Sequence, residues 1–258
     1  MGRAWSREGV TNWWAVLAIG AGVGFLGGLF GKGGSALATP LLHAIGIPAF
    51  VAVAAPLPAA IPSTLVASAP YWKRRLVDRT VLRWSIAFGV PATIAGAMLS
   101  RYVGGNALVR LTDVMLMGIG IRSLLHPGGS ETTDVSALAD RRLRLAFAAT
   151  AVGLASGLLA NSGGFLLVPV YLAVLHLPIK SAFASSLLVS AALAVPGTIV
   201  HVALGHVDWR VVVVFGLASV PLANVGARVA LATGAAKLER IYGGGLVTFG
   251  AALLLFTH

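Results

Sequence analysis

Long apolar runs alternate with short polar segments along the whole chain, and this pattern predicts the secondary structure. Most runs contain about 20 residues, the length that an α-helix needs to cross the hydrocarbon core of a bilayer. The runs are continuous and do not alternate at period two, which argues against a transmembrane β-barrel. The expected helical segments are 13–30, 35–46, 50–70, 80–100, 106–125, 143–160, 164–176, 181–203, 209–231 and 237–256. We therefore predict an all-α polytopic membrane protein.

Two of these segments, 35–46 and 164–176, are too short to cross a bilayer. Twelve helical residues cover only about 18 Å, little more than half of the hydrocarbon core. Each short segment follows a glycine-containing break in the apolar pattern, "GKGG" at 31–34 and "NSGG" at 161–164. The chain is therefore predicted to contain two partial-span helices, each preceded by a broken helix.

The two breaks belong to an internal repeat, because Gly33 and Gly34 are matched by Gly163 and Gly164, 130 positions later. The same offset relates Pro48 to Pro178, Asp78 to Asp208, Pro91 to Pro221, Gly96 to Gly226 and Arg110 to Arg240. We predict two homologous repeats of four to five helical segments each, at 12–125 and 143–256, joined by a polar linker at 126–142.

Composition and charge agree with a membrane protein and exclude other classes. Of the 258 residues, 57% are hydrophobic and 10% charged, whereas a soluble domain carries about a quarter charged residues. The net charge of +11 lies in short loops between apolar runs, as the positive-inside rule expects. It does not indicate a nucleic-acid partner. The lipid bilayer is the expected environment, and the chain is assigned to the cell membrane, as a multi-pass protein of a bacterial inner membrane.

Two arrangements of the repeats remain open. Five segments in the first half would turn the second half upside down, whereas counting each broken pair as one span gives parallel repeats. The loop "KRRLVDRTVLR" has five Lys or Arg residues and its counterpart "ALGHVDWRVVV" has one. This difference favours inverted repeats.

Paired helix breaks in two repeats point to the binding site of a transporter. The N-terminus of a partial helix presents free N–H groups and a partial positive charge, and glycine allows a ligand to approach the backbone. Such ends favour a small anion. The candidate substrate-binding residues at the breaks are Lys32, Gly33, Gly34, Ser35, Asn161, Ser162, Gly163 and Gly164. Among them, Lys32 brings a full positive charge, unless it only extends its ammonium group to the membrane surface.

Four further polar residues lie within predicted spans. Ser63, Thr64 and Thr198 follow prolines, so they either satisfy backbone groups that proline frees or face the substrate path. Asp113 is a candidate for proton coupling, and a surface pair with Arg110, one turn away, is the alternative.

The chain offers little for enzymatic chemistry. It has no cysteine, and its six histidines do not cluster at metal-ligand spacing. We predict no metal, no cofactor and no catalytic residue. The predicted function is secondary transport of a small anionic substrate. The alternative is a membrane-embedded enzyme or an assembly partner without transport activity. A homo-oligomer is compatible with the sequence.

The order of motifs resembles the sulfite exporter TauE/SafE family of membrane permeases. The resemblance rests on "GLFGKGGSALATPLLHAIGIP" and "VDRTVLRWSIAFGVPATIAGAMLS", whose motifs recur in the second half. It implies a permease or exporter for sulfite, sulfonates and related small sulfur-containing or carboxylate anions. Lys32 departs from the family pattern, in which a glycine or another small residue is more usual there.

Overall fold

The structure is a computed structural model that describes residues 12–31, 35–104, 106–108, 110–111, 138–242 and 244. All regular elements in these residues are helices. Their bounds are α1 Trp13–Leu29, α2 Ser35–Ala44, α3 Ala49–Ala54, α4 Pro56–Lys73, α5 Arg79–Leu99, η1 Ser100–Tyr102, α7 Leu138–Leu158, α8 Gly164–Ala173, α9 Ile179–Ala203 and α10 Trp209–Ala232. The prediction of an all-helical fold is confirmed.

Four helical stretches are long and apolar enough to cross a bilayer, judged by length and composition. They are Ala49–Lys73, Arg79–Tyr102, Ile179–Ala203 and Trp209–Ala232. The first of them comprises α3 and α4, which the sequence predicted as one segment. Their junction is at Ala55, before Pro56, because proline has no N–H to continue the helical ladder.

The two predicted short helices are present, since α2 and α8 contain ten residues each. The largest difference from a predicted boundary is at the start of α7, which begins at Leu138 and not at 143. Apolar runs mark only the part of a helix that lipid surrounds, whereas the segment 138–142, which contains Asp140, Arg141 and Arg142, continues the helix beyond it. The predicted segments 106–125 and 237–256 lie only partly within the described residues, and helical residues occur at 106–108, 110–111 and 235–242.

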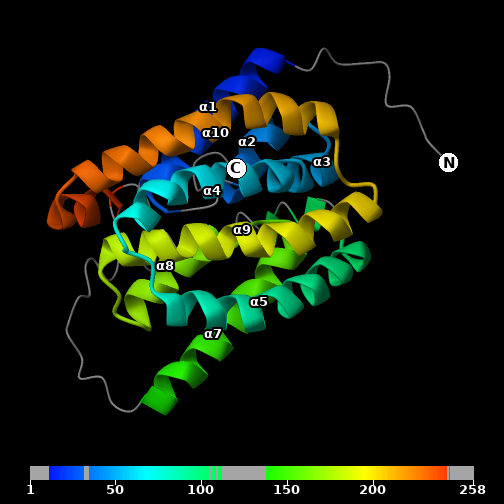
Figure 1. Ribbon diagram of the computed structural model, residues 1–258. Coiled ribbons are helices and arrows are strands. Elements are labelled where there is room, and N and C mark those ends of the chain that lie inside the picture. Colours follow the sequence, from blue (N-terminus) through cyan, green and yellow to red (C-terminus); the bar gives the residue numbers. More distant parts are fainter. Residues whose placement is uncertain are drawn as a thin grey trace.

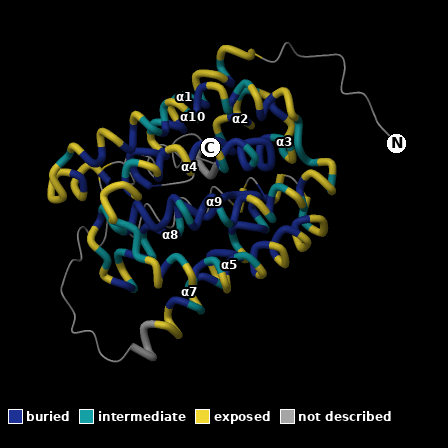
Figure 2. The backbone as a smooth tube through the Cα atoms, viewed as in Figure 1, coloured by how far each residue is buried: buried dark blue, intermediate teal, exposed yellow. Residues whose placement is uncertain are grey.

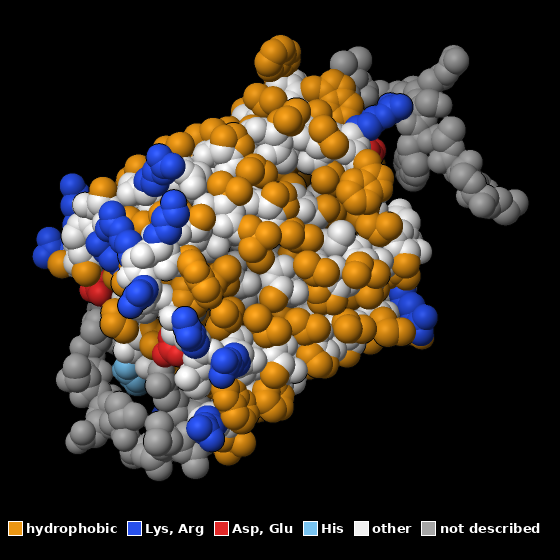
Figure 3. Space-filling view, viewed as in Figure 1, with side chains coloured by type: hydrophobic (Ala, Val, Ile, Leu, Met, Phe, Trp, Pro, Cys, Tyr) orange, Lys and Arg blue, Asp and Glu red, His pale blue; other side chains and the backbone are white. Residues whose placement is uncertain are grey.

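The helices form two layers (Figure 1). One contains α1, α2, α3, α4 and α10, and the other contains α5, α7, α8 and α9. The layers meet mainly where α4 packs on α9. Burial follows this arrangement, with α9 mostly buried and the outer faces of α1, α5 and α10 exposed (Figure 2). The exposed faces are rich in large apolar side chains (Figure 3), as a lipid-facing surface requires.

Glycines bring two pairs of helices into close backbone contact. In α1, Gly20, Gly24 and Gly28 lie against the backbone of Phe215, Ser219 and Ala223 in α10. A Cβ atom on Gly20 would lie 2.5 Å from the Phe215 carbonyl oxygen. In the same way, Gly153 and Gly157 of α7 lie against the backbone of α5 at Gly89 and Thr93. Small residues allow such contacts between helices in a membrane, where van der Waals packing drives association.

The loops at 74–78 and 204–208 lie at opposite ends of the bundle. The backbone N–H of Asp78 donates to the Ser185 hydroxyl near the start of α9, at 3.2 Å. At the other end of α9, the His206 ring stacks on Phe50 at the start of α3, with 4.4 Å between ring centroids. Because these loops occupy matching positions along the chain, their placement bears directly on repeat orientation.

Lysines and arginines gather at the end that contains the 74–78 loop (Figure 3). The start of α7 lies at this end too, because Leu145 packs with Val81 and the Arg142 guanidinium lies 6.0 Å from the centroid of the Trp84 ring. The positive-inside rule predicts that this end faces the cytoplasm.

Labelling of single cysteines in this cysteine-free chain checks the orientation. A membrane-impermeant maleimide added to intact cells should label Arg101→Cys and Arg210→Cys, which are exposed at the end with few basic residues. Arg74→Cys and Arg142→Cys should react only after permeabilisation. Labelling of Arg74→Cys in intact cells would contradict this orientation.

Candidate functional site

The second helix break forms a sharp, buried turn between α7 and α8. Gly163 precedes α8 with a φ of 73°, a left-handed conformation that glycine adopts without strain. The turn is closed to solvent, since Asn161 and Ser162 are 1% and 0% exposed. The sequence therefore placed this break correctly, and glycine makes its geometry possible.

Hydrogen bonds hold the turn in place. The backbone N–H of Gly163 donates to Asn161 Oδ1 at 2.8 Å, and the Ser156 hydroxyl donates to the Asn161 carbonyl. The backbone N–H groups of Leu166 and Leu167 both donate to the Gly163 carbonyl at 3.0 Å. The start of α8 is thus fixed by backbone and side-chain contacts before any ligand binds.

The break lies near the middle of the bundle. The position that a Cβ atom of Gly163 would occupy is 3.2 Å from Leu193 Cδ1, and Leu193 is near the midpoint of α9. The neighbouring Ala160 packs in one cluster with Val53, Leu57 and Ala194. A helix N-terminus at this depth is tolerated only where it is buried in protein or lines a cavity.

The polar side chains that precede this helix end, Asn161 and Ser162, are neutral. Among the described residues, no Asp, Glu, Lys or Arg side chain is buried, and the buried polar side chains are chiefly those of Ser, Thr, Asn and His. A helix N-terminus with amide and hydroxyl groups attracts an anion and does not attract a cation.

The first break is only partly visible. Lys32, Gly33 and Gly34 lie outside the described residues, and Ser35 begins α2 with its side chain outside them. The preceding Gly31 has a φ of 63°, and its carbonyl accepts a hydrogen bond from the Ser186 hydroxyl at 2.6 Å. The prediction that both breaks share one site is not tested by these residues.

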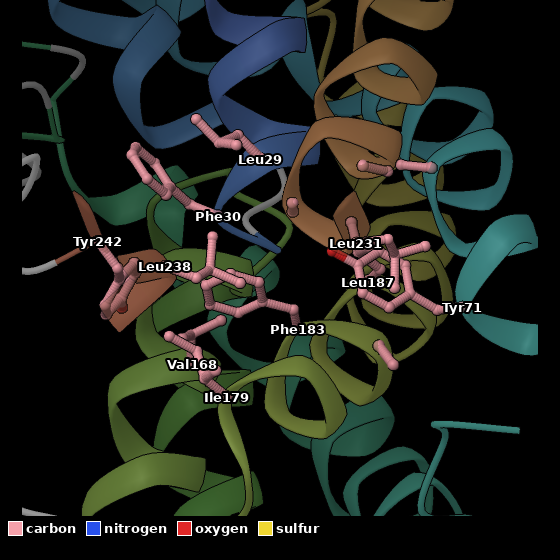
Figure 4. Packing of buried hydrophobic residues seen from close by; sticks show 14 of the residues in the cluster. Leu29, Phe30, Tyr71, Val168, Ile179, Phe183, Leu187, Leu231, Leu238 and Tyr242 are labelled. Atoms are coloured by element: carbon pink, nitrogen blue, oxygen red, sulfur yellow. The ribbon is translucent and has the colours of Figure 1, made fainter. Parts of the chain in front are cut away.

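Helix α9 contacts the chain next to both breaks. Gly31 packs against the backbone of Phe183, and Gly163 lies beside Leu193. These α9 residues are ten positions apart, or about 15 Å along a helix. Phe183 lies within a cluster that includes Leu29 and Phe30 from the end of α1 (Figure 4). The breaks therefore contact α9 at different depths.

Ser63 and Thr64 are buried in α4 and hydrogen-bond to the helix backbone, and their predicted contact with the substrate path stays a prediction. Their hydroxyls donate to the carbonyls of Ala59 at 2.8 Å and Ala60 at 2.7 Å. Both residues also line a narrow crevice of about 10 Å³ between α1, α4 and α10, enough for one water molecule. Ser219 lines the same crevice, with its Oγ 3.1 Å from that of Ser63.

The remaining candidates are on α9 or outside the described residues. Thr198 Oγ1 is buried and has no hydrogen-bond partner among the described residues. Asp113, the candidate for proton coupling, lies outside them. These two predictions therefore remain predictions.

Sequence reasoning missed two serines of α9 that lie between the breaks. Ser186 contacts Gly31 as described above, and Ser190 is buried with no partner for its Oγ in the described part of the chain. A signal was present, since "SSLLVS" places three hydroxyls in an apolar span of a chain that buries few polar groups. The spacing of these serines along α9 could not show which neighbouring segments they face.

Comparison with known proteins gives a consistent result. Residues 16–253 match the family model described as sulfite exporter TauE/SafE. The chain is similar to a "probable membrane transporter protein" of Xylella fastidiosa strain 9a5c, with 29% identity over 241 residues that cover 88% of this chain and 90% of that protein. It is also similar to the "probable membrane transporter protein YunE" of Bacillus subtilis strain 168, with 25% identity over 244 residues, 84% of this chain and 86% of that protein.

No solved structure gives a significant match to the chain. The family match spans both predicted repeats and the linker, and the relatives align over most of their length. The apolar helices of the bundle agree with a multi-pass membrane protein. The chain therefore belongs to the sulfite exporter TauE/SafE family, a family of membrane transporters and not of enzymes.

Proposed function

We propose that this protein is a secondary transporter of small anions, with sulfite, sulfonates or related sulfur-containing anions as substrates, in the inner membrane of a bacterium. The observation that carries the proposal is the buried N-terminus of α8 at Gly163–Gly164, near mid-depth of the bundle. Asn161 and Ser162 precede it and are buried. A cation would find no carboxylate among the buried side chains described above.

Energetic estimates favour an anion at this end. A helix N-terminus stabilises an anion by about 0.3–1 kcal/mol, and by up to about 2 kcal/mol in a partly buried geometry. Hydrogen bonds to a charged group add roughly 1.5–3 kcal/mol each. Several such contacts are needed to offset the loss of hydration of a small anion, which is why a fixed turn with several donors is a suitable site.

Reciprocal helix contacts support a duplicated architecture. Gly24 of α1 contacts Ser219 of α10, and Gly153 of α7 contacts Gly89 of α5. Gly153 lies 129 positions after Gly24, and Ser219 lies 130 positions after Gly89. Each pair thus joins the first helix of one predicted repeat to the fourth helix of the other.

The ends of the bundle favour inverted over parallel repeats. The loops at 74–78 and 204–208 are 130 positions apart and lie at opposite ends of α9. Matching loops of parallel repeats would lie at the same end. Inverted repeats bind substrate near the membrane midplane, at the interface between repeats and at discontinuous helices, which agrees with the proposed position of the site.

Substitution of Lys32 tests the contribution of the first break. Lys32→Met removes the charge and keeps much of the apolar stem, so we expect transport to fall steeply while folding stays near normal. Lys32→Arg should keep part of the activity, because the charge remains although the geometry changes. The measurement is flux by purified protein in proteoliposomes, with sulfite, thiosulfate, sulfonates and carboxylates as test anions.

The same assay separates transport from an assembly role, because only the purified chain is present. Flux of none of these anions through the wild-type chain would contradict the proposed function. Wild-type rates and affinities in Lys32→Met would instead show that the lysine only extends its ammonium group to the interface, and would leave the α8 terminus as the site.

A further inference from the structure

Two histidines form a direct contact at the end of the bundle that has few basic residues. His201, in the last turn of α9, is 0% exposed. Its Nδ1 lies 3.2 Å from Nδ1 of His206, which is in the loop before α10. Its Nε2 lies 3.2 Å from the carbonyl oxygen of Gly157 in α7. The pair thus links a loop to the last turn of the helix that leads into the second break.

The Gly157 carbonyl determines where the protons are. A carbonyl only accepts, so Nε2 of His201 must carry the hydrogen. When His201 is neutral, its Nδ1 is the acceptor, and Nδ1 of His206 must donate. The remaining basic atom is His206 Nε2. A proton added there leaves both hydrogen bonds intact, whereas a second proton on His201 would set two N–H groups against each other at 3.2 Å. The pair therefore accepts one proton.

Access to the pair is from the bundle end. His206 lines a surface hollow of about 380 Å³, together with Pro48, Phe50, Gly104 and Asn106. The Phe50 ring stacks on His206 with an interplanar angle of 20°, and an aromatic face stabilises a cation above it. A proton can reach His206 from this hollow, while His201 stays buried.

Few charged groups lie on the surrounding segments. Within the described residues, α3 and the last two turns of α7 have none, and the nearby loops and helix starts contribute Arg101, Arg110, Asp208 and Arg210. The Asp208 carboxylate accepts from the backbone N–H of Arg210 at 2.8 Å as the N-cap of α10. The Arg101 guanidinium donates to the Tyr102 hydroxyl at 2.6 Å, and Arg110 is exposed.

Burial lowers the pKa of His206 below its ordinary value, so the pair is neutral at pH 7 when the transporter is empty. In that state, protonation costs stability as the pH falls below about 6.5, the ordinary pKa of histidine. A nearby negative charge would reverse this preference. The second break is close by along α7, because Gly157 accepts from His201 and the adjacent Ser156 donates to the carbonyl of Asn161.

From this geometry we propose that the His201–His206 pair is a proton-binding site that couples one proton to the anion bound at the second break. The inference rests on the proposed anion transport and adds the coupling ion to it. The anion favours protonation of the pair, and by reciprocity the protonated pair favours the anion. The proton binds at His206 Nε2, and anion and proton cross together.

Two measurements with thiosulfate test the proposed proton coupling. Methanesulfonate is used instead if the protein does not transport thiosulfate. Neither anion changes its charge between pH 5 and 8, so any effect of pH comes from the protein. In proteoliposomes, wild-type protein should exchange the anion without a gradient and accumulate it when the outside is made acidic. His206→Gln should keep exchange and lose the acid-driven accumulation. His176→Asn, at an exposed turn with a φ of 51° that Asn tolerates, is the matched control and should behave as wild type.

The second measurement is proton uptake on binding, in weakly buffered detergent solution. Wild-type protein should take up as much as one proton per chain, and its affinity should rise by at most tenfold for each unit of pH decrease. His206→Gln should show no uptake and no pH dependence. If it does not fold, His206→Asn replaces it with the same expectation. If wild-type protein exchanges the anion but does not respond to the pH gradient, the proposed coupling is wrong and anion transport stands. The same conclusion follows if the His206 variant responds to the pH gradient as wild type does. Failure to carry either anion overturns both proposals.

Discussion

Replacement of Gly28 by alanine is expected to destabilise the protein more than any other single methyl addition in α1. A Cβ atom at this position would clash with the Ala223 carbonyl oxygen and lie 3.0 Å from Ala223 Cα. Overpacking costs about 1–3 kcal/mol when side chains can adjust. In this case the added atom meets backbone atoms, which cannot rotate away, so α1 and α10 must separate. We therefore expect the free energy of unfolding to fall by about 3 kcal/mol or more.

The same substitution at Gly22 is the matched control. Gly22 is in the same helix and has nothing within 4 Å of the added atom, so Gly22→Ala should be neutral or stabilise by up to about 1 kcal/mol through helix propensity. Thermal unfolding in detergent, followed by the loss of the monodisperse chromatographic peak, measures both. Equal midpoints for the two variants would show that α1 and α10 are not held in close contact.

Much of the secondary structure was predictable because lipid imposes a simple requirement on sequence. A segment that faces lipid must be an apolar helix, so α5, α9 and α10 appear in the sequence within two residues of their observed ends. The start of α7 was wrong by five residues, because polar residues outside the bilayer carry no hydropathy signal. Helix existence is thus a local property that composition reveals.

The helix partners were not predictable in the same way. Hydropathy shows that α1 is buried in a membrane, but it does not show that α1 packs on α10, nearly 200 positions later. The spacing of Gly20, Gly24 and Gly28 marks a face for close packing, yet many glycine-containing faces of this chain could meet it. Only the three-dimensional contacts decide between them.

The candidate site was predicted in part, for related reasons. The turn at Asn161–Gly163 was visible because glycine and polar residues interrupt an apolar run. The pair of His201 and His206 was visible as a spacing of five, but its meaning depends on Gly157, which is 44 positions away. A hydrogen bond between distant segments has no signature in a single sequence, so the proton-binding role that we propose for this pair could not be predicted from the spacing.

Replacement of Asn161 by aspartate is expected to weaken anion binding at least a hundredfold while leaving the turn intact. Asn161 Oδ1 accepts a hydrogen bond from the Gly163 backbone N–H, and a carboxylate oxygen accepts equally well. The substitution therefore preserves the contact that positions the start of α8. It adds a negative charge beside the site that we propose for an anion.

The expected size follows from Coulomb's law. Two like charges about 5 Å apart repel by about 3 kcal/mol at an effective dielectric constant near 20, which corresponds to at least a hundredfold loss of affinity. Asn12→Asp is the matched control, because Asn12 Oδ1 also accepts from a backbone N–H, that of Ala15 at 3.2 Å, but at the exposed start of α1. It should bind thiosulfate or methanesulfonate as wild type does.

The measurement is equilibrium binding of that anion to each variant, made alongside thermal unfolding to establish that the variant is folded. A folded Asn161→Asp protein with a hundredfold weaker affinity, next to an unchanged Asn12→Asp protein, would place the anion at the second break. A folded Asn161→Asp protein that binds the anion as tightly as wild type would show that no negative charge approaches Asn161. The paired breaks would then serve only to shape the bundle, and the substrate path would have to be sought along the serine-containing face of α9.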